Sequence, residues 1–168
     1  MARTEWLRRV GGIAWADATQ AKEHFSEVQR EVLRSRLPFV IHRQGADDEV
    51  VGIGREQLID ILDSLQQARF DPQVTFEPGE VVAVLPGYGV VGSGPTFESA
   101  MDDLSAELLE YASLYFPRLG FYEHTDRVSH YPALVRFVLT PPDERVGLLL
   151  ADSEKVNAVE RQEQFQTA

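Results

Sequence analysis

Pro38 separates two hydrophobic patterns that follow different periods. Before it, apolar residues recur at helical spacing along a helix that would begin at Thr19, a favourable N-cap residue. The predicted buried face comprises Ala21, Phe25, Val28, Val32 and Leu33. The opposite, solvated face comprises Glu23, Glu27, Arg30 and Arg34. Because proline lacks a backbone N–H and cannot continue a helix, we expect this helix to end before Pro38.

A hairpin and a second helix are predicted after Pro38. Residues 39–41 form a short apolar strand, residues 44–48 are rich in turn formers, and residues 50–53 provide the returning strand. The helix that follows has four apolar residues at helical spacing, namely Leu58, Ile61, Leu62 and Leu65. A module this small buries little apolar surface alone, so we expect it to form a homodimer or a higher even oligomer.

A different pattern begins beyond a short linker at residues 66–72. Residues 74–76 and 81–84 flank a Pro78-Gly79 turn and predict a hairpin. A long helix is predicted from Phe97 to about Tyr115. Its predicted core face comprises Phe97, Ala100, Met101, Leu104, Leu108 and Tyr115.

The last fifty residues allow two interpretations. Residues 135–139 and 146–150 are apolar runs, and strands joined by a tight turn are the first interpretation. A helix over residues 132–139 is the alternative, because periodicity does not distinguish the two in runs this short. From Asp152 onward the sequence is polar, and we expect either a frayed helix or a disordered tail that folds on a partner.

Charge is distributed unevenly along the 168 residues, whose net charge is −11. Residues 1–46 contain eight basic and five acidic side chains, a net charge of +3. Residues 68–168 contain seven basic and sixteen acidic side chains, a net charge of −9. This asymmetry favours one anionic and one cationic partner, and an acidic surface that only keeps the protein soluble is the alternative.

Composition limits the setting more than the function. A chain with 43% hydrophobic and 26% charged residues is expected to fold. The absence of cysteine excludes disulfides and thiolate metal sites and agrees with a reducing cytosol. The sequence has no apolar run long enough to cross a bilayer and no leader pattern, so we expect a cytoplasmic protein with no membrane partner.

The first module resembles a known family. Residues 16–25 (ADATQAKEHF) and 37–45 (LPFVIHRQG) resemble the opening of the Phd/YefM antitoxins, and the likeness extends over roughly the first 65 residues. Members of that family bind DNA as dimers and neutralise a toxin. The resemblance implies that Lys22 and Arg43 contact a palindromic operator, with Arg8 and Arg9 as flanking phosphate contacts. Ordinary surface charges are the alternative.

Two features depart from the Phd/YefM pattern. His42 occupies the position of the usual hydroxyl residue, and three consecutive acids stand near the proposed DNA surface, Asp47, Asp48 and Glu49. Acidic side chains there would weaken phosphate binding.

The second module resembles another antitoxin family. The order of a strand, Leu85-Pro86-Gly87, a second strand, Gly94-Pro95-Thr96 and a helix is similar to HicB antitoxins, over about 45 residues. This resemblance implies a β-β-β-α-β fragment of the RNase H-like fold that binds a toxin. Its candidate toxin contacts are acids on an exposed helix face, Asp102, Asp103, Glu107 and Glu110, which could meet a basic toxin surface. Because the C-terminal part of Phd/YefM antitoxins binds toxin, the tail residues Val156, Val159 and Phe165 are further candidates, and an inert terminus is the alternative.

Other chemistry is weakly supported. Residues 87–92 satisfy the pattern G-x-G-x-x-G, but Pro86 precedes them and residues 93–95 separate them from the helix, so turn glycines explain them better than a nucleotide site. Glu123, His124, Asp126 and His130 match no metal template. The sequence contains no recognised catalytic motif, and we expect a non-enzyme without metal or cofactor.

The sequence therefore predicts an α+β protein with a Phd/YefM-like module at residues 1–67, a HicB-like module at 68–151 and a polar tail at 152–168. Its predicted function is that of an antitoxin that neutralises a cognate protein toxin and represses its own operon. The alternative is a dimeric adaptor or transcription regulator without toxin neutralisation.

Overall fold

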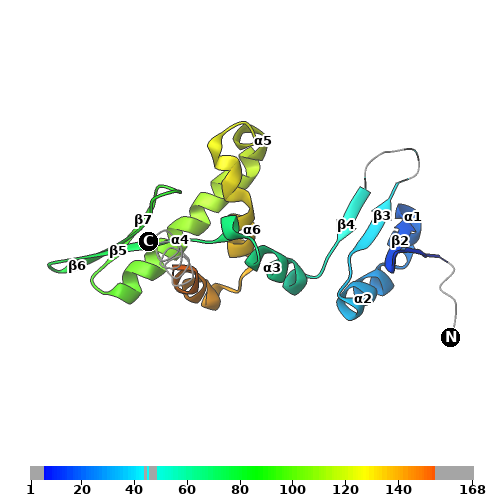
Figure 1. Ribbon diagram of the computed structural model, residues 1–168, viewed down its shortest axis with the longest axis horizontal. Coiled ribbons are helices and arrows are strands. Elements are labelled where there is room, and N and C mark those ends of the chain that lie inside the picture. The colour runs from blue at the N-terminus through cyan, green and yellow to red at the C-terminus, as the bar shows by residue number, and fades with distance from the viewer. Residues whose placement is uncertain (1–5, 44, 46–48, 154–168) are drawn as a thin grey trace, which may run out of the picture. The chain divides into compact units, whose positions relative to one another are not determined.

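The computed structural model describes residues 6–43, 45 and 49–153 (Figure 1). The chain divides into two compact units, which we call unit 1 (Met1–Asp60) and unit 2 (Ile61–Ala168). Residues 61–67, which the sequence analysis assigned to the first module, thus belong to unit 2. Asp63 and Ala68 both contact Arg136 of that unit, which explains the assignment.

Unit 1 is built on a mixed sheet with the strand order β1-β2-β3-β4. The strands are β1 (Arg8–Val10), β2 (Ile13–Asp17), β3 (Phe39–His42) and β4 (Glu49–Gly52). β2 and β3 run parallel and the two outer pairs are antiparallel, so the predicted hairpin after Pro38 is confirmed. One face of the sheet packs on the helices through the buried residues Ala14, Ala16, Ala21, Val28, Val32 and Phe39.

The first predicted helix is two helices. α1 (Ala18–Glu23) and α2 (Phe25–Ser35) are separated at His24, whose φ of −108° and ψ of 29° are not helical. Phe25, the first residue after the break, is 58% exposed, and Leu33, next to the buried Val32, is 72% exposed, so both were wrongly predicted to be buried. The predicted cap was also wrong, because Asp17 caps α1 by accepting a hydrogen bond from the Thr19 N–H at 2.8 Å.

Unit 1 leads into α3 (Arg55–Asp63), which is followed by the 3₁₀ turn η1 (Gln66–Ala68). The helix was predicted from its apolar spacing, but only Leu62 is buried among its residues. η1 lies in the segment that was predicted to be a linker, and Ala68 is fully buried.

Unit 2 contains an antiparallel sheet of β5 (Gln73–Glu77), β6 (Glu80–Leu85) and β7 (Val90–Gly94), in that order. α4 (Phe97–Tyr115) covers one face, and its bounds are those predicted. Thr96 caps the helix together with Ser99. The core between sheet and helix includes Val81, Ala83, Leu85, Val90, Ala100, Met101, Leu104 and Leu108.

The described residues that follow α4 are mainly helical. It comprises η2 (Phe116–Arg118), α5 (Leu119–Tyr122), η3 (Asp126–His130), α6 (Tyr131–Leu139), η4 (Pro142–Glu144) and a helix over residues 145–153. The interpretation of residues 135–139 and 146–150 as strands was therefore wrong. The last strand of the expected β-β-β-α-β order is replaced by helix, whose Leu134, Phe137 and Leu149 are buried.

The predicted start of the polar tail also needs correction. Asp152 lies in the helix over residues 145–153 and is completely buried, and its ion pair with Arg136 compensates its charge there. A lone aspartate in a polar stretch gives no sign of such a partner. The tail candidates Val156, Val159 and Phe165 lie outside the described residues.

Candidate DNA- and toxin-binding surfaces

Two of the predicted DNA contacts, Lys22 and Arg43, lie at the same edge of the sheet of unit 1. Asp17 and His42 are register partners at the carboxyl ends of the parallel strands β2 and β3. α1, which contains Lys22, begins directly after β2, and Arg43 follows β3. Lys22, in the last turn of α1, and Ile41 of β3 both line a groove of about 450 Å³. Lys22 and Arg43 are both exposed, and neither donates a described side-chain hydrogen bond. This arrangement leaves two cations available to an anionic partner.

Arg8 and Arg9 are exposed, but their side chains already contact other residues of unit 1. The Arg8 guanidinium lies 5.3 Å from the ring centre of Trp15. Arg9 donates hydrogen bonds to Glu31 at 2.6 Å and to the carbonyl oxygen of Gly12 at 3.0 Å. The hydrogen bond and charge of Arg9 lower the pKa of Glu31 although burial opposes the shift. A phosphate would have to compete with these contacts.

Acidic groups share the edge with the two cations. Glu49 is the register partner of His42, and the Asp17 side chain is used as the cap of α1. Asp47 and Asp48 lie outside the described residues. Since Glu49 is exposed beside β3, it would weaken phosphate binding locally, as expected from the sequence.

The groove beside Lys22 is mainly apolar. It is lined by Ala18, Ala21, Lys22, Phe25 and Ile41. Val50, the register partner of Ile41, is also exposed. Exposed apolar groups that gather around a groove are typical of a protein interface.

The acids predicted to contact toxin are all exposed on α4. Asp102, Glu107 and Glu110 accept no described hydrogen bond, but Asp103 accepts one from the Ser93 N–H at 2.8 Å. Asp103 therefore also joins α4 to β7. From Phe70 to Pro117 the sequence contains eight acidic residues and no lysine, arginine or histidine. This segment, which we call the acidic segment, includes β5, β6, β7 and α4.

The glycines of the formal nucleotide motif have structural roles. Gly89 has a φ of 66° in the turn between β6 and β7. A Cβ on Gly92 would lie 2.2 Å from the backbone nitrogen of Leu104, so this glycine allows α4 to approach β7. The N-terminus of α4 is capped by Thr96 and Ser99 of the same chain. The turn-and-packing explanation thus accounts for the pattern.

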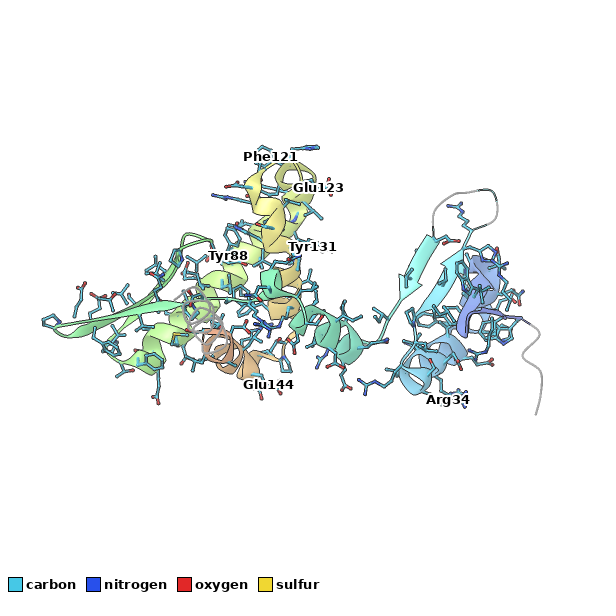
Figure 2. The ribbon with its side chains drawn as sticks, in the orientation of Figure 1. Arg34, Tyr88, Phe121, Glu123, Tyr131 and Glu144 are labelled. Carbon is cyan, nitrogen blue, oxygen red and sulfur yellow. The ribbon has the colours of Figure 1, made fainter. Side chains whose placement is uncertain are left out.

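An aromatic cluster around His130 was not predicted from the sequence. The centre of the His130 ring lies 4.3 Å from the centre of the Tyr88 ring, and its Nδ1 is 2.9 Å from the Tyr111 hydroxyl oxygen. Figure 2 labels Tyr88. Burial, assisted by the nearby Arg127 charge, lowers the pKa of His130. His130 had been considered as a metal ligand with Glu123, His124 and Asp126. No group of three or more such side chains in the described part of the chain could hold a metal ion.

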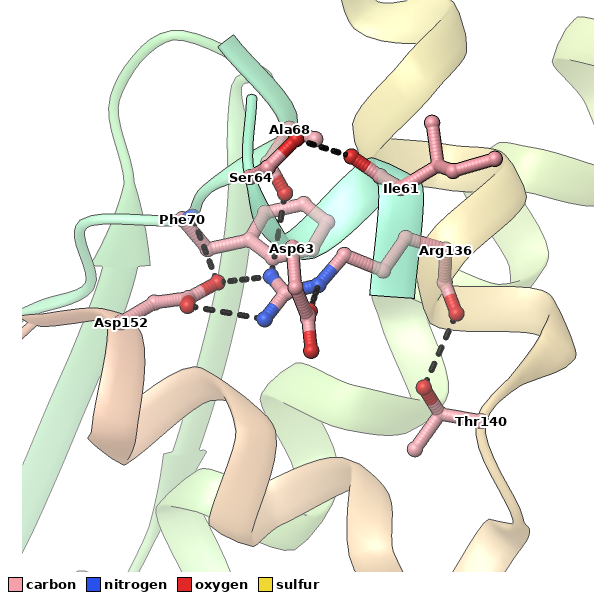
Figure 3. Close-up of polar contacts among 8 residues, drawn as sticks. All are labelled: Ile61, Asp63, Ser64, Ala68, Phe70, Arg136, Thr140 and Asp152. Atoms are coloured by element: carbon pink, nitrogen blue, oxygen red, sulfur yellow. Dashed lines mark hydrogen bonds and ion pairs between the residues drawn. The ribbon is translucent and has the colours of Figure 1, made fainter. Parts of the chain in front are cut away.

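A buried ion pair was also missed by the sequence analysis. Arg136 and Asp152 are 2% and 0% exposed, and the two terminal guanidinium nitrogens of Arg136, Nη1 and Nη2, donate to the Asp152 carboxylate (Figure 3). Asp152 also accepts a hydrogen bond from the Phe70 N–H at 3.1 Å, and Arg136 binds Asp63 and the carbonyl oxygen of Ala68. The pair connects α6, the last described helix and the start of the sheet. It is structural rather than a ligand site.

The described residues form no helix that is both long and apolar enough to cross a bilayer.

A family model for PHD-like proteins, described as the antitoxin of a toxin-antitoxin, RelE/RelB, TA system, matches residues 14–152. The chain belongs to this antitoxin family. Because the match extends through both units, it applies to more than the first module.

The antitoxin is also similar in fold to a solved structure. That protein is described as the antitoxin part of a proposed toxin/antitoxin system from Syntrophomonas wolfei subsp. wolfei. The two chains are 24% identical and superpose with a TM-score of 0.64, over 80% of this antitoxin and 94% of the other chain. No curated protein sequence matches the antitoxin. The family indicates a regulatory protein with a toxin partner rather than an enzyme.

Proposed function

We propose that the antitoxin uses its two units for two partners. Unit 1 binds operator DNA as a dimer, and unit 2 binds and neutralises a cognate protein toxin. The observation that carries the proposal is the separation of charge in a member of an antitoxin family. Unit 1 exposes Lys22 and Arg43 at one sheet edge, whereas the acidic segment of unit 2 has no basic residue.

Operator binding is assigned to Lys22 and Arg43. Lysine can neutralise a phosphate, and arginine can bind phosphate or read guanine through two hydrogen bonds. Arg8 and Arg9 are secondary candidates, because Arg8 stacks on Trp15 and Arg9 is paired with Glu31. To contact DNA, Arg9 would have to separate from Glu31 or bind a phosphate with its remaining N–H donors.

Dimerisation is assigned to the apolar groove at the same edge. Phe25 and Val50 are exposed near Ile41, and a second copy would bury them. A two-fold axis through this groove would place two copies of Lys22 and Arg43 on one side, as a palindromic operator requires.

Toxin binding is assigned to the exposed acids of α4, Asp102, Asp103, Glu107 and Glu110. Complementary charge accelerates the association of proteins and disfavours incorrect partners. Asp103 already binds Ser93, so Asp102, Glu107 and Glu110 are the stronger candidates. Val156, Val159 and Phe165, which lie outside the described residues, complete the proposed set of toxin contacts.

Unit 1 would correspond to the Phd/YefM module. Unit 2 would share with HicB antitoxins only three strands and the helix that follows them, because its later elements are helical. Toxin binding in one unit would change operator affinity in the other, which is the linkage that autorepression requires.

The proposal is tested by growth rescue. The small reading frame adjacent to this gene is induced alone and then together with the antitoxin, and the two products are co-purified. The proposal predicts growth arrest by the neighbour alone, and rescue with a stable complex. If the neighbour is harmless and nothing co-purifies, neutralisation is refuted, and operator binding by the chain alone would support the alternative of a regulator without a toxin.

A further inference from the structure

The two margins of the sheet in unit 2 differ. On the β7 side, α4 packs closely on the strand and Asp103 accepts a hydrogen bond from the Ser93 N–H. On the other side, β5 pairs only with β6 in the described part of the chain. Four of its five residues are exposed. β5 therefore presents an edge to which another strand could bind.

The register identifies the backbone groups at this edge. Glu77 and Glu80 are partners across the Pro78-Gly79 turn and form the closing hydrogen-bonded pair of a two-residue hairpin. Hydrogen-bonded and non-hydrogen-bonded pairs alternate along an antiparallel ladder. The N–H and C=O groups of Val74 and Phe76 consequently point away from β6.

An independent contact supports this register. Ser93 is the partner of Val82 in β7, yet its N–H donates to Asp103 rather than to β6. The backbone groups of Val82 must then point toward β5, where Val82 pairs with Thr75. The backbone N–H and C=O groups of Thr75 therefore point toward β6, and those of its neighbours Val74 and Phe76 point away from β6.

The side chains around the edge favour a particular partner. Phe76 is 71% exposed on the sheet face that α4 covers, since its partner Val81 lies in the core. The other face of β5 carries Gln73, Thr75 and Glu77, and Asp71 and Glu80 lie nearby in sequence. An added strand would thus contact an apolar side chain on one face and polar or acidic side chains on the other.

We propose that the β5 edge binds an extended, basic segment of the toxin by strand addition, with apolar and basic residues alternating along that segment. The inference rests on the proposed function, because it assigns the toxin as the occupant. We choose a basic partner because the acidic segment contains eight acids and no basic residue. A second copy of the antitoxin would bring the same acids to the edge and would be repelled. Main-chain hydrogen bonds would supply affinity, and the alternating side chains would supply specificity.

The test uses the full-length antitoxin and two synthetic peptides with blocked ends. One peptide alternates lysine and valine over nine residues, and the other alternates glutamate and valine. Backbone amide shifts are followed by NMR, and affinity is measured by fluorescence anisotropy. We expect the lysine peptide to bind and to shift the amides of Val74 and Phe76 most, and the glutamate peptide to bind at least about tenfold more weakly.

Matched variants separate strand addition from simple charge attraction. Phe76→Ala keeps the outward N–H, whereas Phe76→Pro removes it without removing a bond to β6, so we expect Phe76→Pro to bind about tenfold more weakly than Phe76→Ala. If Phe76→Pro does not fold, Val74→Pro and Val74→Ala replace it, because the N–H of Val74 also points away from β6, and the proline variant should bind the lysine peptide more weakly than the alanine variant.

Equal binding of both peptides, shifts confined to α4, or self-association of the antitoxin through β5 would overturn the inference. The peptide assay does not use the toxin, so its failure is distinguishable from a failure of growth rescue.

Discussion

Asp152 binds the guanidinium of Arg136 and the backbone N–H of Phe70 with the same carboxylate, inside the core of unit 2. Three segments that are distant in sequence therefore depend on one buried charge pair. Such a pair is costly to bury, and removing one partner leaves the other charge without compensation.

Asp152→Ala should therefore lower the free energy of unfolding by about 3–5 kcal/mol, measured by urea denaturation. Asp102→Ala removes an exposed carboxylate and should change it by less than about 0.5 kcal/mol. The double variant Arg136→Met with Asp152→Leu should regain much of the loss, because no unpaired charge remains. An Asp152→Ala variant as stable as the wild type would show that the pair is not a determinant of the fold.

Two glycine substitutions should have opposite effects. Gly92→Ala places a Cβ 2.2 Å from the Leu104 nitrogen and 2.6 Å from the Ala100 carbonyl oxygen, so α4 and β7 must separate. We expect a loss of at least about 1–3 kcal/mol. Gly147→Ala meets no atom within 4 Å in a helix and should gain about 0.5–1 kcal/mol. Thermal unfolding of both variants measures the difference, and equal effects would contradict the close packing of β7 on α4.

Charge reversal at the edge of unit 1 should abolish operator binding. Lys22→Glu with Arg43→Glu removes two cations, so affinity for the upstream DNA should fall and its dependence on salt should become less steep. Arg30→Glu with Arg34→Glu is the control with the same change of charge, because both residues are exposed on α2 and Arg34 lies in its last turn, toward the other end of the strands (Figure 2). Circular dichroism checks the fold, and gel-shift titrations at several salt concentrations measure affinity. Unchanged affinity in the double variant would remove the assignment.

The stability of unit 2 should decrease in mild acid. The folded-state pKa of His130 is lowered by burial and by Arg127, so protonation favours the unfolded chain. The contribution of His130 is therefore fully present above its unfolded pKa of about 6.5 and decreases as the pH falls toward the folded-state pKa. His130→Gln should flatten this part of the stability profile, whereas His124→Gln, at an exposed position, should keep it. A profile that is identical in wild type and His130→Gln would contradict the predicted linkage.

The sequence predicted elements where a local signal was long or specific. The apolar spacing from Phe97 to Tyr115 extends over five turns, and it defined α4 with its correct bounds. Pro78 and Gly79 likewise located the hairpin of β5 and β6. The division of the first helix at His24 has no such signal, so the exposure of Phe25 was missed.

The other differences between prediction and structure come from short, ambiguous apolar runs and from contacts between residues distant in sequence. The apolar runs at residues 135–139 and 146–150 are too short for periodicity to distinguish strand from helix. Arg136 is separated from Asp63 by 73 positions, and only the folded structure brings them together. The edge with Lys22 and Arg43 was proposed from a family resemblance, whereas the geometry that places α1 and Arg43 at adjacent strand ends came from the structure.

Growth rescue with two matched charge variants tests most directly whether unit 1 binds DNA and unit 2 binds toxin. One variant carries Lys22→Glu and Arg43→Glu, the other carries Glu107→Lys and Glu110→Lys, and each is co-expressed with the adjacent reading frame and assayed for operator binding. We expect the first variant to rescue growth without binding the operator, and the second to bind the operator without rescuing growth. Loss of both activities in either variant, or of neither in both, would contradict the assignment of DNA to unit 1 and toxin to unit 2.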